Sequence, residues 1–194
     1  MVKRVLVIAS GRTEQMALPH LLTHLSAEGI AVEVRIPDRN RKLLPSIVAS
    51  IIYDSLYDFT EETPDKYVVL IDTDGKTTED VLRPLQEGLQ RANVERHVPS
   101  LLYAYAQWHL EAWYFADAGN LRVYLGRDVG NVNPNQPDRI ENPKHHLMQL
   151  LGTKTYTSTV SEEIAKTLDA QTIAQRSPSF AGFLAAVRNG DAGD

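Results

Sequence analysis

Two aspartates, Asp72 and Asp74, flank a single residue in the segment LIDTDGK, directly after a run of apolar residues. Alternate side chains of an extended chain point to the same side, so these two carboxylates can face one ligand. Carboxylate pairs of this kind bind hard cations such as Mg²⁺ or Mn²⁺ in phosphoryl-transfer sites. The spacing also fits a turn in which both aspartates hydrogen-bond to the backbone and Gly75 adopts a positive φ.

Two glutamates are further candidates for the same chemistry. Glu111 lies in the segment WHLEAWYFAD, among aromatic and apolar residues. A carboxylate is costly to bury there unless it is paired or binds a metal, which favours a functional role for Glu111. Glu14 follows the segment VLVIASG, and it has a second interpretation because acidic residues stabilise a helix N-terminus through the helix dipole.

Cysteine and histidine add little further evidence for a site. The chain has no cysteine, which excludes a disulfide framework, a thiolate zinc site and a cysteine nucleophile. His20 and His24 have a spacing that can bind metal on a helix, but no third ligand is evident. His109 is of more interest because it lies two residues before Glu111.

Alternating strands and helices must position these residues. A short, continuous β-branched run predicts a strand over Lys3–Ala9, and further apolar segments predict strands over Ile30–Ile36, Tyr67–Ile71 and Val98–Ala106. Apolar periodicity predicts helices from Thr13, as N-cap, to Gly29, and over Leu43–Phe59, Thr78–Ala92 and His109–Asp117. The alternation predicts an α/β fold with a parallel sheet of about four strands and helices on both faces. Ligands of such sheets bind beyond the carboxyl ends of the strands, where the candidate carboxylates could converge.

The remainder of the chain is expected to extend the same domain. We expect one domain over residues 1–194, with an α/β core over 1–117 and a loop and helical extension over 118–194. The segment Gly126–Asn142 is rich in Asn, Gly and Pro, which predicts a loop that is mobile or covers the site. Short helices are expected over Pro143–Asn189, followed by a frayed end, NGDAGD.

Charge and hydropathy limit the partners and the cellular location that we expect for this protein. The net charge of −5, from 20 basic and 25 acidic residues, argues against a surface that grips nucleic acid as a whole. A local basic segment, Arg35–Lys42, is either a solvated loop or a contact patch. No stretch approaches the roughly 18 apolar residues of a membrane helix. The opening residues are too short in apolar length for a signal peptide, so we expect a cytoplasmic protein with no membrane partner.

With these residues in view, the chain resembles the bacterial DUF4276 family, a Toprim-like family, and is more distantly similar to the catalytic domains of OLD-family nucleases. Five segments carry the resemblance in the expected order: GRTEQMALPHLL, LIDTDGK, HLEAWYFADAGNL, ENPKHHL and RSPSFAGFL. Together they span nearly the whole chain. The resemblance implies a parallel Toprim-like, Rossmannoid sheet with a helical C-terminal tail.

The resemblance also implies a site that binds Mg²⁺ or Mn²⁺ and cleaves or forms phosphodiester bonds. Asp72 and Asp74 match the D-x-D pair of that site, and Glu14 matches the second glutamate of its first motif. Glu111 resembles a later acid of the OLD-type site. Lys144 matches a basic residue that could stabilise transition-state charge on a phosphate. The chain departs from the pattern at Ser10, where Toprim enzymes carry their principal glutamate.

Two functions therefore stand side by side. The first is a Mg²⁺-dependent nuclease or phosphodiesterase acting on DNA or RNA, in which Glu14, Asp72, Asp74 and Glu111 hold metal and Lys144 contacts phosphate. The second is a catalytically inactive module that binds a partner protein in a phage-defence or mobile-element system. Ser10 and the negative net charge favour the second. A nucleotide-sugar glycosyltransferase, suggested by VLVIASG, would need a second Rossmann-like domain for which 194 residues leave no room.

Overall fold

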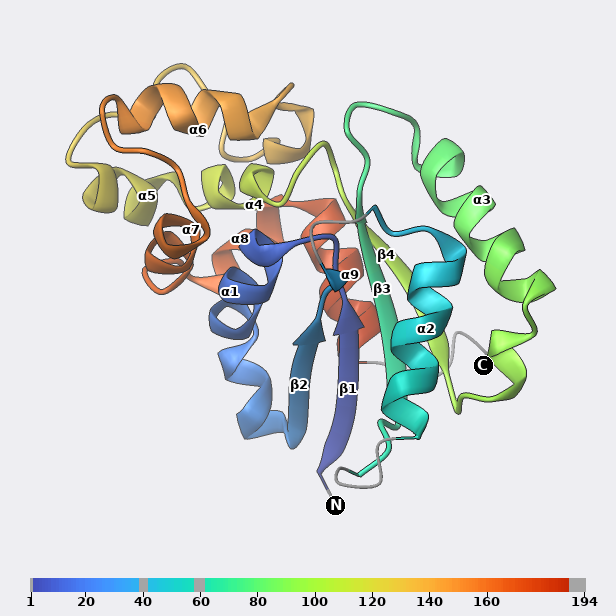
Figure 1. Cartoon of the computed structure of the whole chain (residues 1–194). Coiled ribbons are helices and arrows are strands. Elements are labelled where there is room, and N and C mark those ends of the chain that lie inside the picture. The colour runs from blue at the N-terminus through green and yellow to red at the C-terminus, as the bar shows by residue number, and fades with distance from the viewer. Residues whose placement is uncertain (1, 39–41, 58–61, 189–194) are drawn as a thin grey trace.

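The four predicted strand segments form one parallel sheet in the strand order β2-β1-β3-β4 (Figure 1). The computed structural model describes residues 2–38, 42–57 and 62–188. Its strands are β1 (Lys3–Ile8), β2 (Ile30–Arg35), β3 (Lys66–Asp72) and β4 (Leu101–Ala106). The α/β fold class and the parallel sheet of four strands are thus confirmed.

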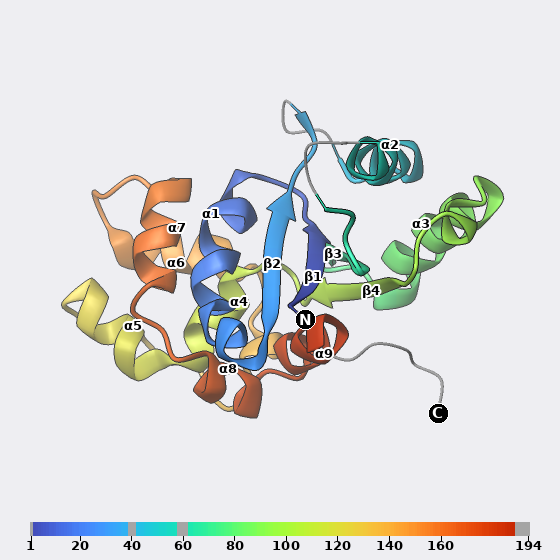
Figure 2. The same ribbon diagram turned by 90° about the horizontal axis from the view of Figure 1, so that it is seen from below.

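The two central strands, β1 and β3, are the most buried because helices cover both of their faces. On one face, α2 (Pro45–Leu56) and α3 (Thr78–Arg91) enclose a core with Leu6, Ile8 and Val69. The other face packs Val5, Val7 and Val68 against the remaining helices. Figure 2 shows α2 and α3 on one side of the sheet and α1, α8 and α9 on the other.

Helix α1 (Arg12–Leu21) begins earlier than the sequence suggested. The predicted N-cap at Thr13 is wrong, because Thr13 lies inside the helix and extended Gly11 precedes it. The helix contains Pro19, which cannot donate to the preceding turn, and it ends two residues later. A 3₁₀ segment, Thr23–Glu28, continues to Gly29, whose φ of 75° ends it. His20 and His24 therefore lie in different elements, and His20 Nε2 is instead 3.2 Å from a Glu162 carboxylate oxygen.

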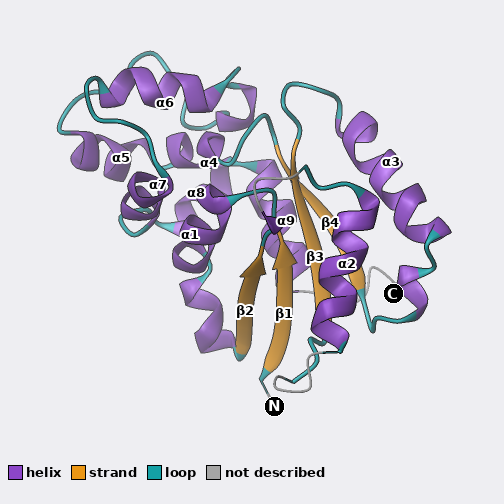
Figure 3. Ribbon diagram, in the orientation of Figure 1, coloured by secondary structure: helices purple, strands orange, loops and turns teal. Residues whose placement is uncertain are grey.

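The second half of the chain is helical, as predicted (Figure 3). It contains α4 (Glu111–Ala116), α5 (Ala118–Leu125), α6 (Pro143–Leu151), α7 (Ser158–Ala165), α8 (Ala170–Arg176) and α9 (Pro178–Arg188). Helix α7 packs along α1, and α9 packs against β4. The C-terminal region thereby covers the face of the sheet opposite α2 and α3. Within the described residues, no helix has both the length and the apolar character needed to cross a membrane.

The loop between α5 and α6 is anchored to the start of α9. It contains a short 3₁₀ turn, Pro137–Arg139, and its Asp138 carboxylate accepts hydrogen bonds from the Ser177 and Ser179 hydroxyls, at 2.7 and 3.0 Å. Asp138 also accepts the Ser179 backbone N–H, at 2.8 Å. The Ser179 hydroxyl in turn accepts the Trp113 indole N–H, at 2.8 Å. The segment RSPSF thus has a structural role.

Two expectations fall partly outside the described residues. The fraying predicted for residues 189–194 lies there, and so does the centre of the basic segment, residues 39–41.

Candidate functional site

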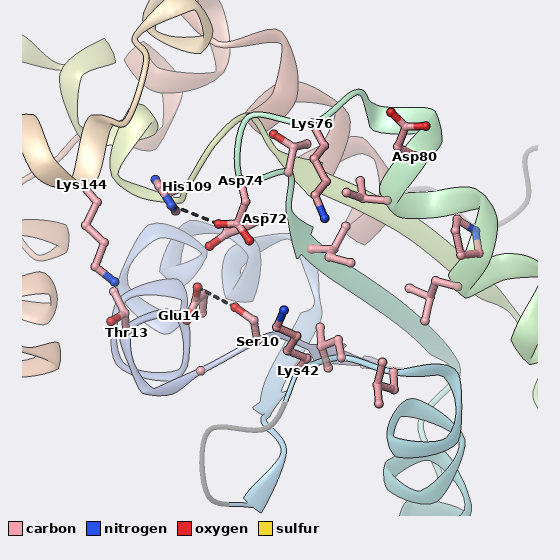
Figure 4. A pocket seen from close by; sticks show the side chains of 18 of the residues that line it. Ser10, Thr13, Glu14, Lys42, Asp72, Asp74, Lys76, Asp80, His109 and Lys144 are labelled. Carbon is pink, nitrogen blue, oxygen red and sulfur yellow. Dashed lines mark hydrogen bonds and ion pairs between the residues drawn. The ribbon is translucent and has the colours of Figure 1, made fainter.

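A pocket of about 710 Å³ opens at the carboxyl ends of β1 and β3 (Figure 4). The end of β3, the loops after these two strands and the start of α1 supply residues 10–14 and 72–74 of its wall. Parallel strands all end at the same edge, so helices α1, α2 and α3 all begin beside the pocket. The loop over 126–142 supplies none of the described residues that line the pocket, so its predicted role as a cover is not supported.

Asp72, the last residue of β3, is the centre of the acidic group. Burial raises its pKa well above the usual range, and the negative charges of Glu14, Glu111 and Asp74 raise it further. The positive charge of Lys144 opposes this shift. The Asp72 carboxylate makes no hydrogen bond or ion pair within the described part of the chain. All four predicted carboxylates and Lys144 are therefore close enough to share one electrostatic environment.

Glu14 lies in the first turn of α1 and is 6% exposed. The Ser10 hydroxyl donates a hydrogen bond to Glu14 Oε1, at 3.0 Å (Figure 4). Burial raises the pKa of Glu14, while hydrogen bonds from its backbone and from Ser10 lower it. Ser10 thus supports the neighbouring glutamate and supplies no carboxylate of its own.

Asp74 and His109 form an ion pair at the mouth of the pocket, with His109 Nε2 3.1 Å from Asp74 Oδ1. The Asp74 side chain is 71% exposed, whereas His109 is 18% exposed. His109 Nδ1 is buried and has no hydrogen-bond partner within the described residues. Of the two ring nitrogens of His109, only Nε2 therefore has a partner among the described residues, and that partner is Asp74.

The loops after β3 and β4 are locked together around this pair. The Asp74 N–H donates to the Trp108 carbonyl at 3.0 Å, and the Trp108 N–H donates to the Thr73 hydroxyl at 2.8 Å. Asp74 and Trp108 have positive φ values of 50° and 62°. Gly75, at φ 77°, lies under the Trp108 ring, where an added Cβ would come within 2.6 Å of the indole. The predicted positive φ at Gly75 is correct, and the strained conformations of Asp74 and Trp108 are typical of functional sites.

Glu111 begins α4 and is 2% exposed. The Tyr156 hydroxyl donates to Glu111 Oε1 at 2.7 Å. Burial raises the pKa of Tyr156, and the neighbouring Tyr114 and Glu111 raise it further, which keeps the phenol protonated as a donor. Glu111 itself is not among the described residues that line the pocket, although its charge still raises the pKa of Asp72.

Lys144 lies in the first turn of α6 and enters the pocket from the side opposite α2 and α3 (Figure 4). Its ammonium is 5.9 Å from the centroid of the Tyr156 ring. Its charge lowers the pKa of both Glu14 and Asp72. Tyr156 therefore contacts both the acid and the base that helices α4 and α6 contribute.

The donor set fits a hard cation by its chemistry, because it consists of carboxylate oxygens. As the side chains stand, however, no group of three or more His, Asp or Glu among the described residues could hold a metal ion. Glu14, Asp74 and Glu111 each have a partner, namely Ser10, His109 and Tyr156. Such partners orient metal ligands in many sites. A cation would have to draw the four carboxylates together.

Sequence reasoning missed Tyr156 and Lys76, and it included Lys42 only as the last residue of the basic segment Arg35–Lys42. The two lysines line the pocket, and Lys76 follows the D-x-D-G motif directly, which was a usable signal. Tyr156 lies 45 residues from Glu111 in sequence, and no local pattern marks it.

Comparisons with known proteins give one family and one solved structure. The family described as "Domain of unknown function (DUF4276)" matches residues 10–188. The solved structure is the C-terminal region of the Xanthomonas campestris pv. campestris OLD protein. The alignment covers 96% of this chain and 94% of that chain, at 13% sequence identity and a TM-score of 0.47. No curated protein matches the chain.

Proposed function

The chain belongs to the DUF4276 family, and from the geometry of its pocket we propose that it is a Mg²⁺- or Mn²⁺-dependent phosphodiesterase with a Toprim-like site, acting on DNA or RNA. The observation that carries the proposal is the surroundings of Asp72. Three other carboxylates raise its pKa, and no hydrogen-bond donor from the described residues compensates for them. An unbalanced acidic group in a pocket is a candidate functional site.

Each residue of the group has a role in this proposal. Asp72, Glu14 and Asp74 would hold the cation, and Glu111 would complete the acidic group. When bound, the cation would polarise the phosphate and lower the pKa of a water molecule. Lys144 would neutralise charge that develops on the phosphate. His109 orients Asp74, and Tyr156 orients Glu111.

The direct test is cleavage of single- and double-stranded DNA and RNA with Mg²⁺ or Mn²⁺. We expect Asp72→Asn to reduce cleavage by at least about 100-fold, as loss of a group that stabilises transition-state charge does in other enzymes. Lys144→Ala should also reduce it. Asp128→Asn is the matched control, because Asp128 is exposed and outside the pocket. Absence of divalent-dependent cleavage of all four substrates would contradict the proposal.

A second candidate function is a catalytically inactive module that binds a partner protein in a phage-defence or mobile-element system. Two observations favour it. The described residues contain no preformed group of metal ligands, and Ser10 stands where Toprim enzymes carry glutamate. Titration of Mn²⁺ into wild-type protein and Ser10→Glu separates the two functions. Binding only to Ser10→Glu supports the inactive module, whereas wild-type binding that Asp72→Asn abolishes supports the enzyme.

A further inference from the structure

The pocket continues beyond the acidic group to a wall that the cation chemistry does not use. This wall is formed by the residues just before and at the start of α2 and by the first two turns of α3. Its apolar members are Leu43, Leu44, Pro45, Val81, Pro84 and Leu85. A site for a cation and a phosphate alone needs no such surface. At about 710 Å³ the whole pocket is within the range of roughly 300–1,000 Å³ that holds small organic ligands.

Two lysines stand between the apolar wall and the carboxylates. Lys42 precedes α2 and Lys76 precedes α3, and in Figure 4 the ammonium ends of both are directed into the pocket. Neither side-chain ammonium makes an ion pair or hydrogen bond within the described part of the chain. Lys144 supplies positive charge on the opposite side, next to Glu14 and Asp72. Arg12 also lines the pocket, and its guanidinium donates to Gln15 Oε1 at 2.7 Å. Lys42 and Lys76 on one side and Lys144 on the other therefore place positive charge on both sides of the acidic group (Figure 4).

This arrangement matches a ligand with two anionic groups and an apolar, planar body beside one of them. A phosphate at Lys144 and the carboxylates would be the reacting group. A second phosphate would lie at Lys42 and Lys76, and a base would rest on the apolar wall. A dinucleotide step of a nucleic acid has these parts in this order.

We propose that Lys42, Lys76 and the apolar wall bind one unstacked nucleotide next to the reacting phosphate, so that the substrate is a single strand or a frayed end. The inference rests on the proposed function for the position of the reacting phosphate. A base inside a duplex is paired and stacked, and removing it costs a few kcal/mol. Apart from His109, no aromatic ring is among the described residues that line the pocket, so a base would rest on aliphatic side chains and not stack on an aromatic ring.

The test is fluorescence anisotropy of a labelled single-stranded octanucleotide in Ca²⁺ and in EDTA. We expect Lys42→Ala and Lys76→Ala each to weaken binding by about tenfold, as loss of a charge-assisted contact does. Each should lower the slope of log Kd against log salt concentration by about 0.7. Val81→Trp should weaken binding without changing the salt slope, because it fills the wall and keeps both lysines. Lys166→Ala is the control, because Lys166 is outside the pocket and pairs with Glu162.

The matched duplex should bind at least about tenfold more weakly than the single strand, and a free nucleoside monophosphate more weakly still. Equal affinity for the duplex, or an unchanged Kd and salt slope in the Lys42→Ala and Lys76→Ala variants, would overturn the inference. Cleavage that persists under that result would leave the proposed function standing. Conversely, lysine-dependent binding of the single strand without any divalent-dependent cleavage would support the nucleotide site and contradict the enzyme.

Discussion

Asp72 and Asp138 are both half-buried aspartates, yet their surroundings are opposite. Asp138 accepts three hydrogen bonds from Ser177 and Ser179, at 2.7 to 3.0 Å. Asp72 accepts none within the described residues and faces three other carboxylates. Asp138 is compensated by hydrogen bonds from the protein itself, whereas Asp72 has only the positive charge of Lys144 to offset three carboxylates.

For these two aspartates, the number of hydrogen bonds to the carboxylate indicates a structural or a functional role better than the sequence motif in which the residue lies. Asp138 lies outside the family-like segments, and its partners lie in one of them, RSPSF, yet its contacts fasten a loop to α9. Asp72 lies in LIDTDGK, and its contacts disfavour its own charged form. Burying a charge without a partner lowers stability. Such groups therefore occur most often at functional sites, where a ligand can bind them.

The largest effect on stability should come from removing the compensated aspartate. Asp138→Ala leaves the hydroxyls of Ser177 and Ser179 and the Ser179 N–H without their acceptor. We expect the free energy of unfolding to fall by about 3 kcal/mol, measured by urea denaturation. Asp128→Ala is the control in the same loop, because Asp128 is exposed and makes only surface contacts, with Arg122 at 3.6 Å and with the Gly130 N–H at 3.2 Å. Equal losses of stability for Asp138→Ala and Asp128→Ala would show that the buried hydrogen bonds of Asp138 contribute no more than the contacts of an exposed aspartate.

The next largest effect is stabilisation by a divalent cation, which we expect to require Asp72 and not Asp138. At 100 times its Kd, Mn²⁺ should raise the free energy of unfolding by about 2.7 kcal/mol. Thermal denaturation would show this as a rise in Tm of roughly 5–10 °C for a chain of this size. Asp72→Asn should abolish the rise, and Asp138→Asn should not. An unchanged rise in Asp72→Asn would place the cation elsewhere.

Tyr156→Phe should sharpen the comparison by altering one orienting contact. The substitution removes the hydroxyl that donates to Glu111 and keeps the ring beneath Lys144. Loss of a partner that orients a metal ligand typically costs about tenfold or more in affinity, so Mn²⁺ should bind about tenfold more weakly in calorimetry. Tyr124→Phe is the control, because its hydroxyl pairs with Glu163 at the surface. Equal Mn²⁺ affinity in wild type and Tyr156→Phe would leave Glu111 without a role at the cation.

The smallest effect is the dependence of stability on pH without metal. The pKa values of Asp72 and Glu14 are raised in the folded state above 3.8 and 4.5, so the folded protein binds more protons than the unfolded chain above these values. Stability should therefore decrease as the pH rises through the folded-state pKa values. We expect Asp72→Asn to be more stable than wild type by about 1 kcal/mol at pH 8. The gain should disappear near pH 4, and a gain that is constant with pH would contradict this origin.

Several features were predictable because they depend on short stretches of sequence. Strand β3 and helix α3 follow from the apolar run and the apolar periodicity of their own residues. The sheet edge that gathers Glu14, Asp72 and Asp74 follows from parallel strands ending on the same side. A helix boundary was less predictable, as the cap at Gly11 in place of Thr13 shows, because several neighbouring residues can begin the same helix.

The sequence by itself determined the alternation of elements, the edge at which the acidic residues meet and the absence of glutamate at position 10. Only the tertiary structure decided which residues compensate which charge. Tyr156 reaches Glu111 across 45 residues of sequence, and Ser179 reaches Asp138 across 41. Local patterns set the backbone, but these side-chain contacts depend on how distant helices pack, and packing is a property of the whole chain.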